Sequence, residues 1–215
     1  MDHNRIYEYR FKDVDKQKKN ITWQAIAEFL LRELNYPASI IDPAAGECEF
    51  INAIRVKEKW AVDLNPQFIT KYADKTVHVK TGDALEIELP ANYFDAAFMS
   101  NFLEHLNSQE EINQLLLNIH HALKKGGRVA IMGPNFKYCY KEYFDFADHK
   151  IILTHLSLEE LLYAAGFSIK KTIPRFLPIS FRGRLPVNRF IVNTYLSFPI
   201  LWKIFGKQFL IIAEK

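Results

Sequence analysis

The sequence predicts an α/β fold, a doubly wound and mostly parallel sheet with helices on both faces. Short apolar segments alternate with helical segments along the chain, and the connections between them are brief. The first apolar segment, Ile40-Ile41-Asp42, breaks into small residues around Gly46, as a buried parallel strand does where it passes into a helix. A second apolar segment ends in another acid, Asp63, twenty-one residues after the first.

Seven strands are expected. Apolar runs place them at about residues 39–43, 60–64, 77–80, 94–100, 128–132, 167–173 and 208–213. The last strand follows a break at Gly206 and a long preceding segment, so we expect it to return antiparallel to its neighbours.

Five helices are expected between the strands because apolar residues recur at helical spacing and capping signals bound them. Pro66 suits the first turn of one helix, and Ser108 and Ser157 resemble the first residues of capping boxes. Glycines that follow the last two helices should end them. The expected helices span about residues 16–35, 49–54, 65–72, 108–126 and 157–166.

The composition is that of an ordinary globular protein. The 215 residues are 49% hydrophobic and 25% charged, and the net charge of +3 is too small to indicate a nucleic-acid partner. We expect residues 1–215 to form a single domain. Its insertions, at about residues 134–156 and 174–206, are expected to form a substrate cover.

Other features predict the compartment. Cys48 and Cys139 lie far apart without ligand spacing around them, which predicts reduced thiols and no metal site. The N-terminus is polar and no apolar run reaches roughly 18 residues, so neither a secretory signal nor a spanning helix is expected. We therefore expect a cytoplasmic protein. Lys16, Lys18 and Lys19 lead into a helix and should form a solvated face.

Four polar residues stand at or just past the ends of four successive strands. They are Asp42, Asp63, Asp83 and Asn101. Ligands of open parallel sheets bind outside the carboxyl ends of the strands, so these side chains should face one crevice. The spacing of Asp42 and Asp63 suits a carboxylate that accepts hydrogen bonds from a ribose. The alternative is that each residue is a helix cap or turn residue.

These residues carry a family resemblance. From about residue 20 to its end, the chain resembles a class I S-adenosylmethionine-dependent methyltransferase of the type 11 kind. Ile40–Gly46 resembles the first motif of the family, and Gly82-Asp83-Ala84 resembles its adenine-binding motif. Asn101-Phe-Leu-Glu-His105 matches the segment after the fourth strand, and Leu123-Lys-Lys-Gly-Gly127 is also typical. The resemblance implies a Rossmann-like methyltransferase fold and S-adenosylmethionine as the cofactor.

The resemblance also implies roles for single residues. The backbone from Ala44 to Gly46 would pass under the methionine part, and Asp63 would hold the ribose hydroxyls. Asp83 would accept from the adenine amino group, and the amide of Ala84 would reach the ring. The cofactor-binding residues implied are Asp42, Ala44, Gly46, Asp63, Leu64, Asp83, Ala84 and Asn101. Ala44 and Cys48 stand where the family usually has glycine, and alanine is tolerated there if its φ is negative.

The segments 143–161, 174–178 and 201–208 resemble those of a bacterial subgroup encoded beside polysaccharide or glycolipid biosynthesis enzymes. This implies a small-molecule acceptor with a hydroxyl, such as a sugar or a glycolipid-like compound. A hydroxyl nucleophile benefits from a general base, and histidine is suited to that role near neutral pH. His149 is the first candidate and His105 the second. Either histidine could instead have a packing or pocket-shaping role.

Two other functions stay open. A NAD-dependent oxidoreductase would use Asp63 equally well, but the glycine triplet is missing, and Tyr138 and Lys141 are one residue too close for a Tyr-x-x-x-Lys pair. The second is a non-catalytic or membrane-proximal scaffold with a degenerate cofactor site. Contact with a membrane or a lipid-linked substrate through about residues 182–207 is the less favoured of two interpretations of the apolar segment Phe190–Phe205, around which lie Arg182, Arg184, Arg189, Lys203 and Lys207. A pocket cover or dimer contact would explain the same segment.

Overall fold

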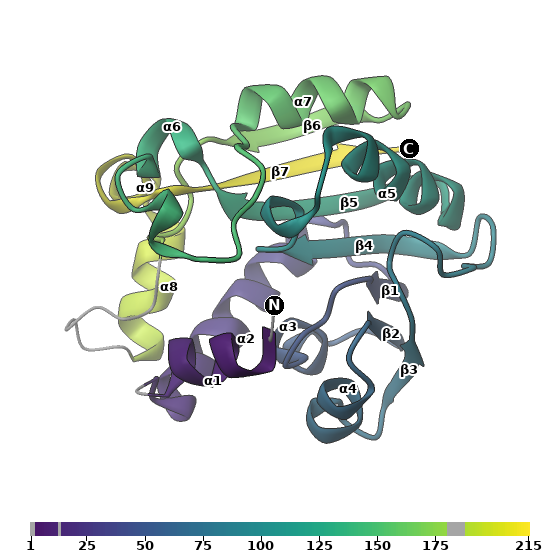
Figure 1. The fold of residues 1–215 in the computed structure, drawn as a ribbon, viewed down its shortest axis with the longest axis horizontal. Helices are drawn as coiled ribbons and strands as arrows, with labels where there is room; N and C mark the ends of the chain where they lie inside the picture. The colour runs from purple at the N-terminus through teal and green to yellow at the C-terminus, as the bar shows by residue number, and fades with distance from the viewer. Residues whose placement is uncertain (1–2, 13, 180–187) are drawn as a thin grey trace.

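The computed structural model describes residues 3–12, 14–179 and 188–215. A seven-stranded sheet has the order β3-β2-β1-β4-β5-β7-β6, and Figure 1 shows the strands following one another from β3 at the lower right to β6 near the top. The strands are β1 (Ser39–Asp42), β2 (Glu58–Asp63), β3 (Val77–Thr81), β4 (Phe94–Ser100), β5 (Leu123–Pro134), β6 (Ser168–Ile173) and β7 (Gln208–Glu214).

The pairing of the strands confirms the predicted fold class. β3, β2, β1, β4 and β5 are joined by parallel pairs, whereas β7 runs antiparallel to both β5 and β6. The order reverses at β1, which lies between β2 and β4. Such a reversal opens a crevice at the carboxyl ends of the strands.

Helices cover both faces of the sheet. The helices are α1 (His3–Phe11), α2 (Lys16–Glu33), α3 (Glu49–Ala53), α4 (Pro66–Tyr72), α5 (Gln109–Ala122), α6 (Phe136–Cys139), α7 (His155–Ala164), α8 (Arg189–Ser197) and α9 (Pro199–Phe205), with 3-10 turns η1 (Leu103–His105) and η2 (Tyr143–Asp145).

Alternating strand residues divide the core into two layers. Ile40 and Phe98 pack with α2, α3, α8 and α9, whereas Ile41 and Met99 pack with α5 and α7. This is the period of two that a strand buried on both sides requires. On the first face, the ring centroids of Phe29 in α2 and Trp202 in α9 lie 6.0 Å apart.

Two predicted helix boundaries were wrong. The helix expected to end at Gly126 ends at Ala122, because Leu123 is extended and pairs with Phe94 as the start of β5. The helix expected to begin at Ser157 is capped by Thr154, with Ser157 in the first turn. The hydroxyl of Ser157 accepts from the backbone N–H of Thr154, and the Thr154 hydroxyl accepts from that of Ser157.

Several elements were not predicted. They are α1, the short elements α6 and η2 inside the first insertion, and α8 and α9 inside the second. Residues 182–187 of the expected membrane-contact segment, with Arg182 and Arg184, lie outside the described residues. Within residues 3–12, 14–179 and 188–215, no helix is long and apolar enough to cross a membrane.

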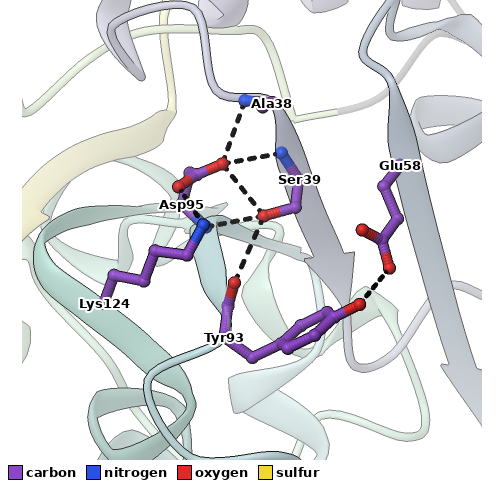
Figure 2. A network of polar contacts seen from close by, with 6 residues as sticks. All are labelled: Ala38, Ser39, Glu58, Tyr93, Asp95 and Lys124. Atoms are coloured by element: carbon purple, nitrogen blue, oxygen red, sulfur yellow. Dashed lines mark hydrogen bonds and ion pairs between the residues drawn. The ribbon is translucent and has the colours of Figure 1, made fainter.

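A polar network ties the starts of β1, β4 and β5 together (Figure 2). One carboxylate oxygen of Asp95 accepts from the backbone N–H of Ala38 (3.1 Å), and from the N–H (2.9 Å) and hydroxyl (3.0 Å) of Ser39. The other accepts from the Lys124 ammonium at 2.7 Å. Burial alone would raise the pKa of Asp95, but the bonds from Lys124 and Ser39 lower it below its ordinary value.

Replacing Asp95 should destabilise the sheet. Asp95→Ala leaves two backbone donors at the start of β1 without their acceptor, so we expect a loss of about 2 kcal/mol in the free energy of unfolding at pH 7. Because the folded-state pKa of Asp95 is lowered, its contribution is present above the unfolded pKa of about 3.9 and is lost as pH falls through the folded pKa. The difference from the unmodified protein should therefore shrink below about pH 4.

Denaturant unfolding at several pH values would measure this difference. Asp95→Asn, which keeps one acceptor oxygen, should lose less stability than Asp95→Ala. Glu160→Gln is the matched control, because Glu160 is exposed. Equal stability of Asp95→Ala and the control at pH 7 would contradict the role given to the network.

Candidate functional site

A cleft of about 860 Å³ opens at the carboxyl ends of β1, β2 and β4. All ten residues that the sequence analysis singled out line it. They are Asp42, Ala44, Gly46, Asp63, Leu64, Asp83, Ala84, Asn101, His105 and His149.

The loop after β1 forms the floor of the cleft. The amide of Ala45 donates to the carbonyl of Val62 (2.9 Å), and the amide of Gly46 donates to Asp63 Oδ2 (2.8 Å), so the loop is fastened to the end of β2. Gly46 has a φ of +51°, and a Cβ there would meet nothing within 4 Å. Glycine is therefore needed at this position for its backbone conformation, and the space above it is open.

The two positions that depart from the family pattern differ in conformation. Ala44 does not have a positive φ, so it meets the condition under which alanine is tolerated at this position. Cys48 has a φ of +59° and a fully buried side chain. The left-handed conformation costs a residue with a Cβ about 1–2 kcal/mol. The strain in this loop therefore falls on Cys48 and not on Ala44.

Asp63 holds two loops at once. Its Oδ2 accepts from Gly46 and its Oδ1 accepts from the amide of Asn65 (2.8 Å). Two carboxylate oxygens offer about four lone-pair sites, so the group keeps acceptor capacity toward the cleft. Asn65, not Asp63, caps α4.

The other strand-end residues also make turn contacts. Asp83 Oδ1 accepts from the amide of Leu85 (2.9 Å), and Asp42 Oδ1 accepts from the amide of Ala44 (3.3 Å). Asn101 has a φ of +49°, and its amide donates to the carbonyl of Met132 (2.9 Å). Asp42 and Asp83 thus act as turn residues, as the alternative expected, because each accepts a hydrogen bond from an amide two residues further on. Both residues also line the cleft.

Acidic groups crowd the floor of the cleft. Asp42 is only 4% exposed, and burial, reinforced by the charges of Asp63 and Glu49, raises its pKa to about 8. Lys19 reaches the same region from α2, where its ammonium pairs with Glu47 (2.7 Å) and Glu49. Burial lowers the pKa of Lys19, but the two glutamates outweigh it and raise that pKa overall. The expectation of a solvated face was therefore wrong for Lys19.

The opposite wall joins η1 to the first insertion. Lys150 and Ile151 donate their amides to the carbonyl of Glu104 (2.8 and 3.2 Å). His105 Nδ1 lies 2.9 Å from the carbonyl oxygen of Asp148, and Arg10 of α1 forms an ion pair with the Asp148 carboxylate. These contacts hold residues 148–151 against η1 at the edge of the cleft.

His149 lies inside this wall. Its ring stacks on Phe146 at 4.8 Å and lies 5.1 Å from the ring of His105. Burial, reinforced by the charge of His105, lowers the pKa of His149 to about 4. Burial also raises the pKa of Glu104, which is 2% exposed. His149 therefore packs in the insertion, as the alternative expected, and also lines the cleft.

Several lining residues were not predicted. Arg10 and Phe11 come from α1, whose sequence has no helical apolar pattern, and Lys19 was assigned to solvent. Glu104 and Asp148 also line the cleft and were not predicted, although an acid next to a candidate histidine is a signal that the sequence offers.

Comparisons with known proteins agree with this geometry. Residues 41–131 match a family model described as "Methyltransferase domain". A crystal structure of a SAM-dependent methyltransferase from Archaeoglobus fulgidus superimposes with a TM-score of 0.70 at 22% identity, covering 100% of both chains. These findings show that the chain shares the fold of this methyltransferase and contains a segment similar to a methyltransferase domain.

Other methyltransferase structures share the fold. One from Thermotoga maritima has a TM-score of 0.67 at 16% identity and covers 98% of this chain and 99% of that one. Geranyl diphosphate methyltransferase in complex with SAM has a TM-score of 0.65 at 15% identity and covers 89% of this chain and 84% of that one. No curated protein sequence matches this chain.

Proposed function

We propose that the cleft binds S-adenosylmethionine and that the enzyme transfers its methyl group to a hydroxyl of a small sugar or glycolipid-like acceptor. The observation that carries the proposal is the convergence of the ten predicted residues on one cleft. The acids Asp42, Glu49 and Asp63 beside the loop suit a cofactor that carries a positive sulfonium. The same acids would repel the pyrophosphate of NAD.

For the cofactor-binding residues we propose the roles that the family resemblance implies. Asp63, with Leu64 beside it, would accept from the ribose hydroxyls, and Asp83 with the amide of Ala84 would bind the adenine. The open backbone around Gly46 would pass under the methionine part, near Asp42, Ala44 and Asn101. This assignment is supported by the free acceptor capacity of Asp63 and by the empty space over Gly46.

The acceptor would enter at the wall that holds His105 and His149. Methyl transfer is an in-line attack on a sulfonium carbon, so the enzyme mainly positions the acceptor. Histidines at this wall would act on the hydroxyl, and we propose both as catalytic residues. Residues 1–215 would form one domain whose insertions cover the acceptor, since Phe146 of the first and Ile179 of the second line the cleft.

Asp63→Ala should weaken the binding of S-adenosylhomocysteine by at least about tenfold, because charge-assisted hydrogen bonds contribute about 1.5–3 kcal/mol each. Isothermal titration calorimetry would measure the affinity. Thermal unfolding would check that the loops at Gly46 and Asn65 still fold. Asp145→Asn is a control, because Asp145 is exposed and lies outside the cleft lining. An unchanged affinity would place the ribose elsewhere, and stabilisation by NAD alone would favour an oxidoreductase.

His149→Ala and His105→Ala should each lower turnover by about a hundredfold while leaving cofactor affinity nearly unchanged. Glutamine at either position should restore little activity, because an amide neither takes up a proton nor donates an imidazole lone pair. Single-turnover kinetics with candidate sugar acceptors would measure the rate, and calorimetry the affinity. His121→Ala is the control, since His121 is exposed on α5. If both histidine variants kept full activity, neither histidine would be catalytic, and positioning of the acceptor alone would account for the reaction.

We further propose that α8 and α9 contact a membrane surface that holds the acceptor. Six large apolar side chains on and between these helices are exposed, from 41% to 80%: Phe190, Ile191, Phe198, Ile200, Ile204 and Phe205. Residues 161–213 contain eight lysines and arginines and no acid. Exposed apolar groups together with this charge suit an anionic lipid surface.

The unpaired cysteines Cys48 and Cys139 support a cytoplasmic location.

The protein should float with vesicles that contain anionic phosphatidylserine and much less with neutral vesicles. A double variant, Ile200→Glu with Ile204→Glu, should lose flotation because it places charge in the apolar surface of α9. Ile152→Glu is the control, since Ile152 is similarly exposed in the first insertion. Failure to float with anionic vesicles would remove the membrane contact. The apolar surface would then be a pocket cover or a contact between two copies.

A further inference from the structure

We propose that Glu104, His105 and His149 form a binding site for a first-row divalent transition-metal ion at the acceptor end of the cleft. Within the part of the chain that the structure describes, these three side chains are a convergent group, with ligand atoms within 4.8 Å of one another. The proposal rests on the proposed function only in placing the acceptor beside these residues.

The three groups can turn lone pairs toward a common point. Glu104 Oε1 lies 4.0 Å from His105 Nε2, which is beyond hydrogen-bond distance, so the two atoms do not bond each other. Nδ1 of His149 is buried and has no hydrogen-bond partner. A buried imidazole nitrogen without a partner costs folding free energy, and a bound cation would supply the partner that Nδ1 of His149 lacks.

The second ring nitrogen of each histidine is held as a metal ligand requires. Nδ1 of His105 lies 2.9 Å from the carbonyl of Asp148, so an Nδ1–H tautomer would leave Nε2 as the acceptor. A hydrogen bond with the backbone of Tyr143 engages His149, and since Nδ1 has no partner, we assign that bond to Nε2. Histidines that bind metals nearly always donate their other N–H to a carbonyl or carboxylate in this way.

The framework around the cluster is fixed by the backbone. Residues 150 and 151 donate to the carbonyl of Glu104, so the insertion that carries His149 is joined to the turn that carries the other two ligands. The positive charge of Arg10 is balanced by its ion pair with Asp148. The ligand atoms would approach an ion at about 2.0–2.2 Å, which requires small rotations of the three side chains.

The ligand set favours one class of ion. Two imidazoles with one carboxylate suit zinc, iron, cobalt or manganese better than magnesium, which prefers oxygen ligands. An acceptor hydroxyl bound to such an ion would lose its proton to solvent more readily. Transfer then forms one oxygen–carbon bond and breaks the sulfur–carbon bond, whose electron pair stays on sulfur. Both catalytic histidines would then act as ligands.

Cobalt(II) is the probe of choice for the full-length protein, because its visible absorption reports coordination by nitrogen. We expect one cobalt ion per chain by calorimetry, with a change in the absorption spectrum. Glu104→Gln and His149→Ala should each weaken this binding by at least about tenfold. His121→Ala is the matched control and should bind as the unmodified protein does, because His121 is exposed on α5. Circular dichroism would confirm that the variants fold.

The outcomes separate this proposal from the proposed function. No cobalt binding, or binding equal in Glu104→Gln and the unmodified protein, would overturn the metal site. Methyl transfer that survives a chelator would overturn the role of the ion toward the acceptor hydroxyl. Cobalt binding without methyl transfer to any acceptor would keep the metal site and count against the proposed function. Loss of turnover with EDTA that manganese restores would support both.

Discussion

The carboxylate of Asp63 is the constraint on which the geometry of the cleft depends. It stands at the end of β2 and accepts from the amides of Gly46 and Asn65, which belong to the loops after β1 and β2. The carbonyl of Asp63 also accepts from the amide of Gly82, just past β3. Asp63 therefore links three loops to one another. It also lines the cleft.

This arrangement has an electrostatic consequence. Because Asp42 is buried next to Asp63 and Glu49, its pKa is raised to about 8, so much of it is protonated at neutral pH in the unliganded protein. A cationic group in the cleft would favour the ionised carboxylate. The cleft is thus electrostatically suited to a positively charged ligand. Ala44 is unstrained, and the left-handed residue is Cys48.

The sheet and the cofactor end of the cleft could be predicted from the sequence, because both are encoded locally. Apolar runs mark the strands, and the residue after each strand lies at the same edge of a parallel sheet. The helix ends were less predictable: Gly126-Gly127 resembles a helix stop, yet pairing of Leu123 with Phe94 begins a strand earlier. The pairing of β4 with β5 therefore decides where α5 ends, in place of the local glycine signal. The helix α1 carries no periodic pattern, so its contribution of Arg10 to the wall could not be predicted.

The wall that holds His105 and His149 is formed by contacts between distant segments. His105 and His149 are forty-four residues apart. Hydrogen bonds of residue 104 with residues 150 and 151, and of His105 with residue 148, hold the segments together, and the two rings lie 5.1 Å apart. Sequence spacing alone could not bring these two histidines together for that reason. Burial then sets the chemistry of this wall, because it raises the pKa of Glu104 and lowers that of His149. A nearby cation would stabilise the ionised form of the Glu104 carboxyl group, whose pKa is raised. The imidazole of His149, whose pKa is lowered, stays neutral at physiological pH.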